Sequence, residues 1–335
     1  MLPGKLRSAQ RRITDGADLH KGAAGLGDFM TDAEKKALVA SVAFWFHSYD
    51  FGEGVSAAGH KSLAQLRAEW DLMKLPELRG KSVLDVNTWD GWFALQAERA
   101  GAGRVLGLDW YMWSMDQQAH SRYHAEHKAA GTIPDPYHAM PYFRPAELPG
   151  KVGFDTARRI SQSRVEEMVG DFATMDLSPL KNGFDVVFYL GTLYHMADPI
   201  GNLRRLYEVT APGGLAVIET AAMEVPGLED IPMCENYGPL HRLNADSSNW
   251  WSPNAAALRQ MLLAVGFEAA EVTTQPARER VFMSRRDAAR RLLPARLRKL
   301  ISSTPARPPV RRYRAFAHAR RSSEPTTHPS PIPSA

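Results

Sequence analysis

The sequence predicts an α/β protein with a doubly wound parallel sheet, and three observations support this class. From Lys81 onward, short β-branched segments alternate with helix-like segments. Asp85 and Asp109 stand near the ends of the first two strand-like segments, where such sheets bind ligands. The composition is that of a globular chain, with 44% hydrophobic and 23% charged residues in 335. No apolar run approaches the ~20 residues of a membrane-spanning helix.

The N-terminal region precedes this alternation. Residues 1–30 are rich in Gly, Ala and charge, and we expect them to be flexible. Thr31 with Glu34 three positions later is a capping box, which predicts the start of a helix. A Gly-rich loop follows Tyr49, and LAQLRAEWDLM predicts a second helix. Residues 31–76 are therefore expected to form a helical cap.

The core is expected to span residues 77–284. Its predicted strands, in chain order, are KSVLDV, RVLGLD, RVEEMVGD, FDVVFYLG, GLAVIET, FEAAEVTT and RERVFMSR. Its predicted helices are WFALQAERAG, SMDQQAHSRYHAEHK, FDTARRIS, GNLRRLYEV and a stretch that begins at Ser252-Pro253 and ends at Gly266. The segments 131–150 and 221–250 follow neither period and are expected to be insertions that shape a pocket.

The C-terminal segment 285–335 is rich in Arg and Pro, which predicts a largely disordered tail. Residues 278–321 hold fifteen Lys and Arg against two acids, so the rest of this chain of net charge +4 is acidic, at net −9. A solvated tail is the simplest interpretation, and contact with RNA or an anionic membrane is the alternative.

A single cysteine, Cys234, excludes an internal disulfide and a cysteine-based zinc site. With no apolar segment after the basic N-terminus, a cytoplasmic protein is expected. His47, Asp50 and His60 match no metal-ligand spacing, so no metal is expected. The sequence does not indicate an oligomeric state.

The most informative segment is the turn VLDVNTWDG and the strand that follows its helix. A tight turn lets the backbone approach a ligand, and Asp109 after the second strand is suited to ribose hydroxyls. A dinucleotide fold would have G-x-G-x-x-G here. This turn has Gly91 with the acids Asp85 and Asp90, which repel a pyrophosphate but suit the cationic S-adenosylmethionine (SAM). Nicotinamide cofactors are disfavoured.

At this turn the sequence resembles the class I SAM-dependent methyltransferases, with Asn87 in place of the first Gly of acid-x-Gly-x-x-x-Gly. Asn tolerates a left-handed backbone better than most residues. The resemblance implies a Rossmann-like, seven-strand methyltransferase sheet with SAM as its cofactor. The residues that it implies for cofactor binding are Asp85, Asn87, Thr88, Gly91, Asp109, Trp110, Asp171, Phe172 and Leu190.

The stretch G-x-L-Y-H-x-x-D-P after the fourth strand narrows the resemblance. With WFHSYDFGEG and DSSNWWSPNAAALRQMLLAVGF, it is similar to the tRNA wobble-uridine carboxymethyltransferases and their small-molecule relatives, over residues 42–275. In the tRNA enzymes the Tyr of this motif helps to hold the carboxylate of carboxy-SAM, and Tyr194 matches it. The Lys and Arg that share this task in the family are not located by the sequence. SAM is therefore expected rather than carboxy-SAM.

Three residues are candidates for catalysis. His195 directly follows the fourth strand and is suited to act as a base; Tyr194 beside it and Glu219 at the end of the fifth strand are the others. Candidates for substrate binding are Trp45, His47, Tyr194, Asn249 and Trp250. Each has a structural alternative, such as helix capping for His195, a strand-end acid for Glu219 and core packing for the tryptophans.

Three functions remain open from the sequence. A methyltransferase acting on a small molecule, at a hydroxyl oxygen, is favoured because the body of the chain is acidic. A tRNA-modifying enzyme of the wobble-uridine type, which grips RNA with its basic tail, is the alternative. A non-catalytic binding protein that retains the fold is the third, and Asn87 is the feature that favours it.

Overall fold

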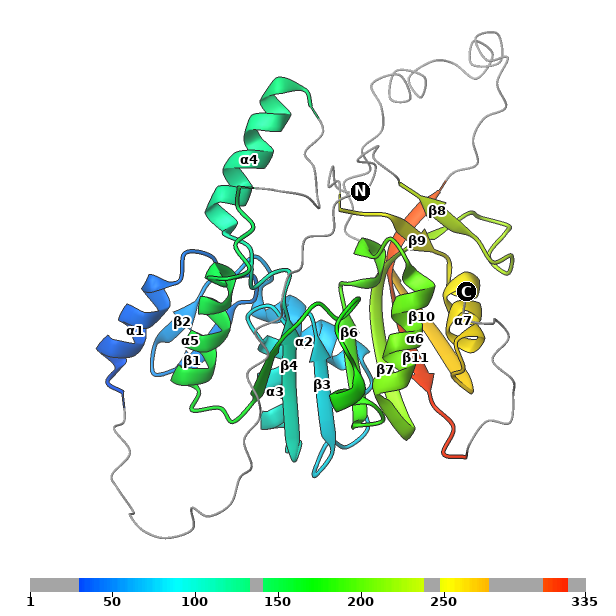
Figure 1. The fold of residues 1–335 in the computed structure, drawn as a ribbon, viewed down its shortest axis with the longest axis horizontal. Helices are drawn as coiled ribbons and strands as arrows, with labels where there is room; N and C mark the ends of the chain where they lie inside the picture. Colours follow the sequence, from blue (N-terminus) through cyan, green and yellow to red (C-terminus); the bar gives the residue numbers. More distant parts are fainter. Residues whose placement is uncertain (1–29, 133–140, 238–247, 277–309, 325–335) are drawn as a thin grey trace, which may run out of the picture.

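A computed structural model describes residues 30–132, 141–237, 248–276 and 310–324. Its centre is a seven-stranded sheet in the order β10-β11-β7-β6-β3-β4-β5, in which β11 alone runs against the others (Figure 1). This confirms the predicted doubly wound α/β class. The strands are β3 (Ser82–Val86), β4 (Arg104–Asp109), β5 (Glu166–Val169), β6 (Phe184–Leu190), β7 (Thr210–Glu224), β10 (Ala269–Pro276) and β11 (Arg311–Arg320).

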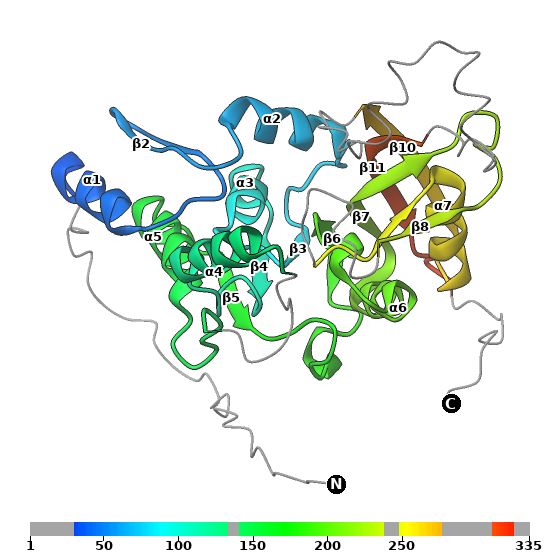
Figure 2. The same cartoon turned by 90° about the horizontal axis from the view of Figure 1, so that it is seen from above.

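Helices cover both faces of the sheet, and alternate strand residues serve the two hydrophobic layers. Val187 packs into a layer with α6 and α7, and its neighbour Val186 into a layer with α2, α3 and α5. Figure 2 shows α3 and α6 on opposite sides of the strands. The helices are α1 (Asp32–Ser41), α2 (Leu63–Leu72), α3 (Trp92–Arg99), α4 (Gln117–Ala130), α5 (Val152–Ile160), α6 (Pro199–Val209) and α7 (Ala255–Ala264).

Strand order reverses beside β3, the first strand of the core. The chain passes from β3 to β4 and β5 on one side, and then returns to place β6 and β7 on the other. Ligands of such sheets bind in the crevice at the carboxyl ends beside this reversal. A hydrogen bond from Asn87 Nδ2 to Thr192 Oγ1 (3.3 Å) joins the loops that follow β3 and β6 across it.

The sequence predicted a helical cap over residues 31–76, but the structure is only partly helical there. The capping box at Thr31 is present. The predicted Gly-rich loop, however, is a hairpin of β1 (Tyr49–Gly52) and β2 (Val55–Ala57). Gly52 and Gly54 take left-handed φ angles of 82° and 73° at its turn, a conformation that glycine adopts without strain. The segment therefore turns back on itself instead of forming an open loop.

The expectation of a disordered tail is wrong for Arg311–Arg320. This segment is β11, paired along its length with β7 on one side and β10 on the other. Small or aromatic residues of β11, which include Ala315, Phe316 and Ala317, are buried. The burial of their apolar surface stabilises the strand although it contains many arginines. Residues 285–309 and 325–335 of the predicted tail, and the whole of the predicted strand RERVFMSR, lie outside the described residues.

Two boundaries near the C-terminal side of the core also differ from the prediction. The helix predicted to begin at Ser252-Pro253 begins at Ala255, because Asn254 is the residue whose side chain caps it. Ser252 and Pro253, which were predicted to begin the helix, belong instead to β9 (Trp251–Pro253), which pairs with β8 (Cys234–Asn236). The segment 221–250 thus begins as a continuation of β7 and includes β8.

Candidate functional site

The turn between β3 and α3 is held in an unusual backbone conformation. Asn87, Trp89 and Gly91 all have left-handed φ angles, of 59°, 53° and 82°. A Cβ on Gly91 would lie 2.6 Å from Phe154 Cδ2, so no larger residue fits there. Asn87 adopts the conformation that its place in the motif requires. The conformation of Trp89 was not foreseen from the sequence.

Three buried carboxylates surround this turn. Asp85 accepts a hydrogen bond from Thr88 Oγ1 (2.6 Å), and Asp109 accepts from the backbone N–H of Trp89 (2.9 Å) and of Met112 (3.0 Å). Asp90 is the third. No Lys or Arg forms an ion pair with any of the three among the described residues.

Burial raises the pKa of Asp85 to about 7, because a desolvated carboxylate resists ionisation; the bond from Thr88 opposes this and the nearby charge of Asp109 adds to it. Burial also raises the pKa of Asp109 to about 6, against the effect of its backbone donors. A cationic ligand beside Asp85 and Asp109 would favour the ionised form of both carboxyls. The carboxylates of the turn therefore fit a cation such as SAM.

Asp109 is wholly buried, and its carboxylate braces the turn through the backbone bonds described above. Its contact with a ribose stays a prediction. Of the other residues predicted to bind the cofactor, Trp110 meets the ring of Phe143 edge-on at 5.0 Å. Asp171 accepts from the N–H of Ala173 and from Thr174 Oγ1, which holds its own loop in place.

Phe172 and Leu190 lie near the end of β6 but differ in burial. Phe172 is 2% exposed and packs in the core against Tyr189, with ring centroids 5.9 Å apart. Leu190 is half-buried. Phe172 therefore has the surroundings of a core residue, while Leu190 has the exposure that a binding residue needs.

Trp45 and His47 tie the N-terminal segment to the turn. The N–H groups of Phe46 and His47 donate to Asp90 Oδ2 at 2.9 Å, and His47 Nδ1 also bonds the carboxylate. Trp45 is buried and meets Tyr49 edge-on, with centroids 5.3 Å apart. These contacts agree with the packing alternative for both residues, and a role toward substrate stays a prediction.

Tyr194 and His195 lie on the short helix η3 (Leu193–His195), directly after β6. His195 Nδ1 lies 2.8 Å from Ser248 Oγ and 3.2 Å from the Ser248 carbonyl oxygen. The N–H of Trp250 donates to the Tyr194 carbonyl (2.7 Å). The structure thus brings the segment 248–250, which holds the buried Asn249, to the residues that follow β6.

Arg314 of β11 is a site residue that sequence reasoning missed. Its guanidinium lies 4.9 Å from the centroid of the Tyr194 ring and forms a two-pronged ion pair with Glu219, with Nη2 2.5 Å from Oε2. The alternation of Tyr313, Ala315 and Ala317 around it is the signal that could have indicated a strand and hence a position in the sheet.

Glu219 is 3% exposed. Burial alone would raise its pKa, but the charge and hydrogen bonds of Arg314, with a smaller contribution from the charge of Lys61, lower it below its ordinary value. A paired carboxylate that holds its charge this firmly is a weak proton acceptor. The geometry therefore favours the structural alternative for Glu219 over the role of base that the sequence predicted.

No group of three or more His, Cys, Asp or Glu that could hold a metal ion is found in the part of the chain that the structure describes. Within the same residues, none of the helices has the length and apolar character to cross a membrane.

Residues 60–272, well over half of the chain, match the family model described as a methyltransferase domain. The tRNA U34 carboxymethyltransferase of Ectopseudomonas mendocina (strain ymp) is 27% identical over 207 residues, which make up 60% of this chain and 50% of that protein. The protein of the same name from Pseudomonas savastanoi pv. phaseolicola is 29% identical over 206 residues, with the same coverage. This chain spans about half the length of the curated relatives it matches.

Two solved structures resemble the chain in outline. One is an S-adenosylmethionine dependent methyltransferase from Mesorhizobium loti, with a TM-score of 0.41 and 19% identity over 76% of this chain and 98% of that one. The other is phosphoethanolamine N-methyltransferase 2 of Haemonchus contortus, with a TM-score of 0.47 and 14% identity over 78% of this chain and 53% of that one.

Proposed function

Because the chain belongs to the methyltransferase domain family, we propose that it transfers the methyl group of SAM to a hydroxyl oxygen of a small molecule. The chain is a SAM-dependent methyltransferase; the acceptor is the part that we propose. The observation that carries it is His195, whose ring follows β6 at the carboxyl edge of the sheet and is bonded at Nδ1 to Ser248.

In this proposal the turn after β3 binds the cofactor, and the residues of η3 act on the acceptor. SAM supplies an electrophilic methyl group on a cationic sulfur. Asp85 and the backbone of the turn at Gly91 would hold the cofactor, and the charge of Asp85 suits a sulfonium. In the tautomer that carries its proton on Nδ1, His195 donates to the Ser248 carbonyl and keeps its basic lone pair on Nε2, which takes the proton of the acceptor hydroxyl as its oxygen is methylated. Tyr194 and Trp250 orient the acceptor beside it.

The affinity for SAM is expected to be about tenfold weaker at pH 6 than at pH 8. With the pKa of Asp85 raised to about 7, only about a tenth of this carboxyl is ionised at pH 6, so the charge that attracts the sulfonium is lost as the pH falls. Isothermal titration calorimetry at the two pH values measures the change.

Two variants test whether Asp85 is the cause of this pH dependence of SAM affinity. Asp85→Asn should bind SAM weakly at both pH values and lose most of the slope. Asp116→Asn is the matched control, because this helix-capping carboxylate has a lowered pKa and is already ionised at pH 6. A full pH slope in Asp85→Asn would contradict the assignment.

The variant His195→Gln is expected to lower kcat by about 10²- to 10⁴-fold with little change in SAM affinity, since a general base contributes only while the proton moves. Release of S-adenosylhomocysteine with a panel of hydroxyl-bearing acceptors is the readout. His127→Gln on α4 serves as control, because that ring bonds Thr132 on the same helix end. Unchanged turnover in His195→Gln would remove this residue from the mechanism.

Carboxymethyl transfer from carboxy-SAM is the second candidate, and Arg314 favours it. The family resemblance calls for a Tyr, a Lys and an Arg around the cofactor carboxylate. Arg314 beside the Tyr194 ring supplies the Tyr and the Arg of such a set. Lys61 pairs with Glu69 at 2.7 Å, and its charge also lowers the pKa of Glu219. Native mass spectrometry of the purified protein tests this: bound carboxy-SAM, heavier than SAM by one carbon dioxide, would bring this candidate first, and bound SAM would favour methyl transfer.

A tRNA acceptor is supported only by the names of the curated relatives. Five of the fifteen basic residues of segment 278–321 lie in β11 or directly after it, and so belong to the sheet and its edge. The acidic remainder of the chain favours a small acceptor. A cytoplasmic setting stays part of the proposal. A non-catalytic role would follow if the protein bound no SAM at all, which the same titrations detect.

A further inference from the structure

Segment 44–49, which ends at the first residue of β1, contacts the turn between β3 and α3 at two consecutive residues. The first is Trp89, whose ring is stacked on that of Phe46, with centroids 3.9 Å apart and an angle of 8° between the planes. Phe44 also stacks on the Trp89 ring, at 5.9 Å and 23°. Stacked aromatic pairs attract each other beyond the effect of burying their area. The segment therefore holds the side chain of Trp89.

The second residue is Asp90, which is 1% exposed. Its carboxylate accepts hydrogen bonds from the N–H groups of Phe46 and His47 and is bonded to His47 Nδ1. Its backbone carbonyl oxygen accepts a hydrogen bond from the hydroxyl of Tyr49. All of these partners lie in segment 44–49. Because a buried carboxylate is costly without such partners, Asp90 and the segment stabilise each other.

Trp89 is a residue of this turn whose backbone needs support. Its φ of 53° lies in the left-handed region, which a bulky side chain seldom adopts. Its N–H donates to Asp109 Oδ2, and its carbonyl oxygen accepts from Trp113 Nε1 at 2.6 Å. The stack on Phe46 fixes the side chain as well. A left-handed residue of this kind persists only where its surroundings hold it, and segment 44–49 supplies part of that hold.

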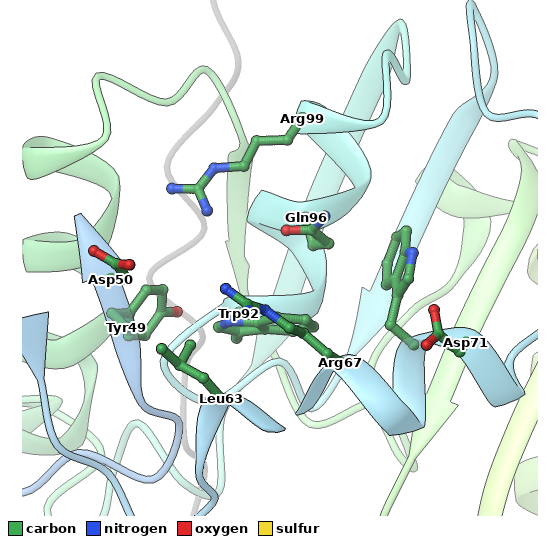
Figure 3. A pocket seen from close by; sticks show the side chains of 9 residues that line it. Tyr49, Asp50, Leu63, Arg67, Asp71, Trp92, Gln96 and Arg99 are labelled. Carbon is green, nitrogen blue, oxygen red and sulfur yellow. The ribbon is translucent and has the colours of Figure 1, made fainter. Parts of the chain in front are cut away.

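A hollow leaves one side of α3 open next to this contact. It has a volume of about 410 Å³ and opens between β1, α2 and α3, beside Gln96 and Arg99 (Figure 3). The ring of His47 meets Phe93 edge-on, with centroids 5.7 Å apart, at the beginning of the same helix. The N-terminal segment thus meets α3 where the helix leaves the turn, and the hollow lies farther along.

We propose that segment 44–49 is a positioning element for SAM. By holding Trp89 and Asp90 it keeps the turn in the conformation that binds the cofactor, and Phe46 and His47 are its positioning residues. The inference rests on the binding of SAM at this turn, as the proposed function does, and not on the identity of the acceptor. Because coupling between two sites is reciprocal, bound SAM also holds the segment in place.

Calorimetric titration of the full-length protein with SAM tests this role. Phe46→Leu is expected to bind SAM about three- to tenfold more weakly than the parent, since the loss of one stacked pair is an effect of this size. Phe51→Leu is the matched control, because this half-buried ring stacks on Tyr49 at 5.1 Å and lies in the same hairpin region. Thermal unfolding without SAM should show a similar loss of stability in both variants, so the difference in affinity reports on the turn.

Two variants of His47 test the bond to Asp90. His47→Leu is expected to weaken SAM binding by about tenfold, because the buried carboxylate loses a partner. His47→Asn places an amide N–H donor near the position of Nδ1 and should recover most of the affinity. Recovery by a donor of similar bulk is a result that a general loosening of the fold would not give. If His47→Leu does not fold, the comparison of Phe46→Leu with Phe51→Leu decides.

Hydrogen exchange measures the reciprocal effect. Saturating SAM should slow exchange in the peptide that contains Phe46 and His47, and should slow it less in Phe46→Leu. Equal SAM affinity in Phe46→Leu and Phe51→Leu, no recovery in His47→Asn, or exchange in segment 44–49 that SAM does not change would overturn the proposal and leave SAM binding itself intact. A parent protein that binds no SAM would overturn the cofactor assignment as well.

Discussion

Replacing Arg314 with methionine is expected to lower the free energy of unfolding by about 3 kcal/mol, because Glu219 would be left buried without its partner. The same change should abolish activity, since the guanidinium also contacts the Tyr194 ring. Urea denaturation followed by circular dichroism measures the first effect.

Two variants show whether the pair is the cause. Arg311→Met removes an arginine of the same strand that is exposed and pairs with Glu224 at 3.6 Å, so it should cost less than about 1 kcal/mol. Glu219→Gln in the Arg314→Met background should recover part of the loss, because the unpaired charge is gone. An Arg314→Met protein as stable as the parent would show that the pair contributes nothing.

Ending the chain after residue 309 is expected to prevent folding altogether. β11 provides the pairing partner of both β7 and β10, and it buries Phe316 and the alanines around it. Loss of these contacts exceeds the margin of stability of an ordinary domain. Gel filtration and thermal unfolding compare this chain with one that ends after residue 324, which should fold as the parent does.

A cooperative unfolding transition in the chain that ends at 309 would contradict the role given to β11. The same reasoning means that deleting the basic segment as a whole cannot report on RNA binding. Substitutions that neutralise arginines before residue 310 are the appropriate change, because they leave β11 in place.

What the sequence predicted correctly is local. The capping box at Thr31, the buried strand at 184–190 and the turn at Gly91 each depend on a few neighbouring residues, and all are present in the structure. Asn87 is an example of the same kind, since its left-handed backbone follows from the position that it holds in the motif.

What the sequence did not predict depends on distant partners. Glu219 and Arg314 are 95 positions apart, and His47 and Asp90 are 43 apart, so no local pattern shows that each is paired. The pairing with Arg314 lowers the pKa of the candidate base Glu219, and the bond to Asp90 ties the candidate substrate residue His47 to the turn. Composition also misled the prediction, because ten residues that hold four arginines suggest a solvated tail until their register beside β7 is known.

The position of β11 also bears on how the chain is made. It follows every other strand of the sheet in chain order, yet it lies between two of them. As the ribosome delivers the chain, β3 to β7 can assemble into a parallel unit first, while β10 has no neighbour until Arg311–Arg320 has emerged. Exposed strand edges attract chaperones and other nascent chains. The rate of translation between β10 and β11 therefore sets how long the nascent protein stays open to misassembly, and slow codons there would lower its yield.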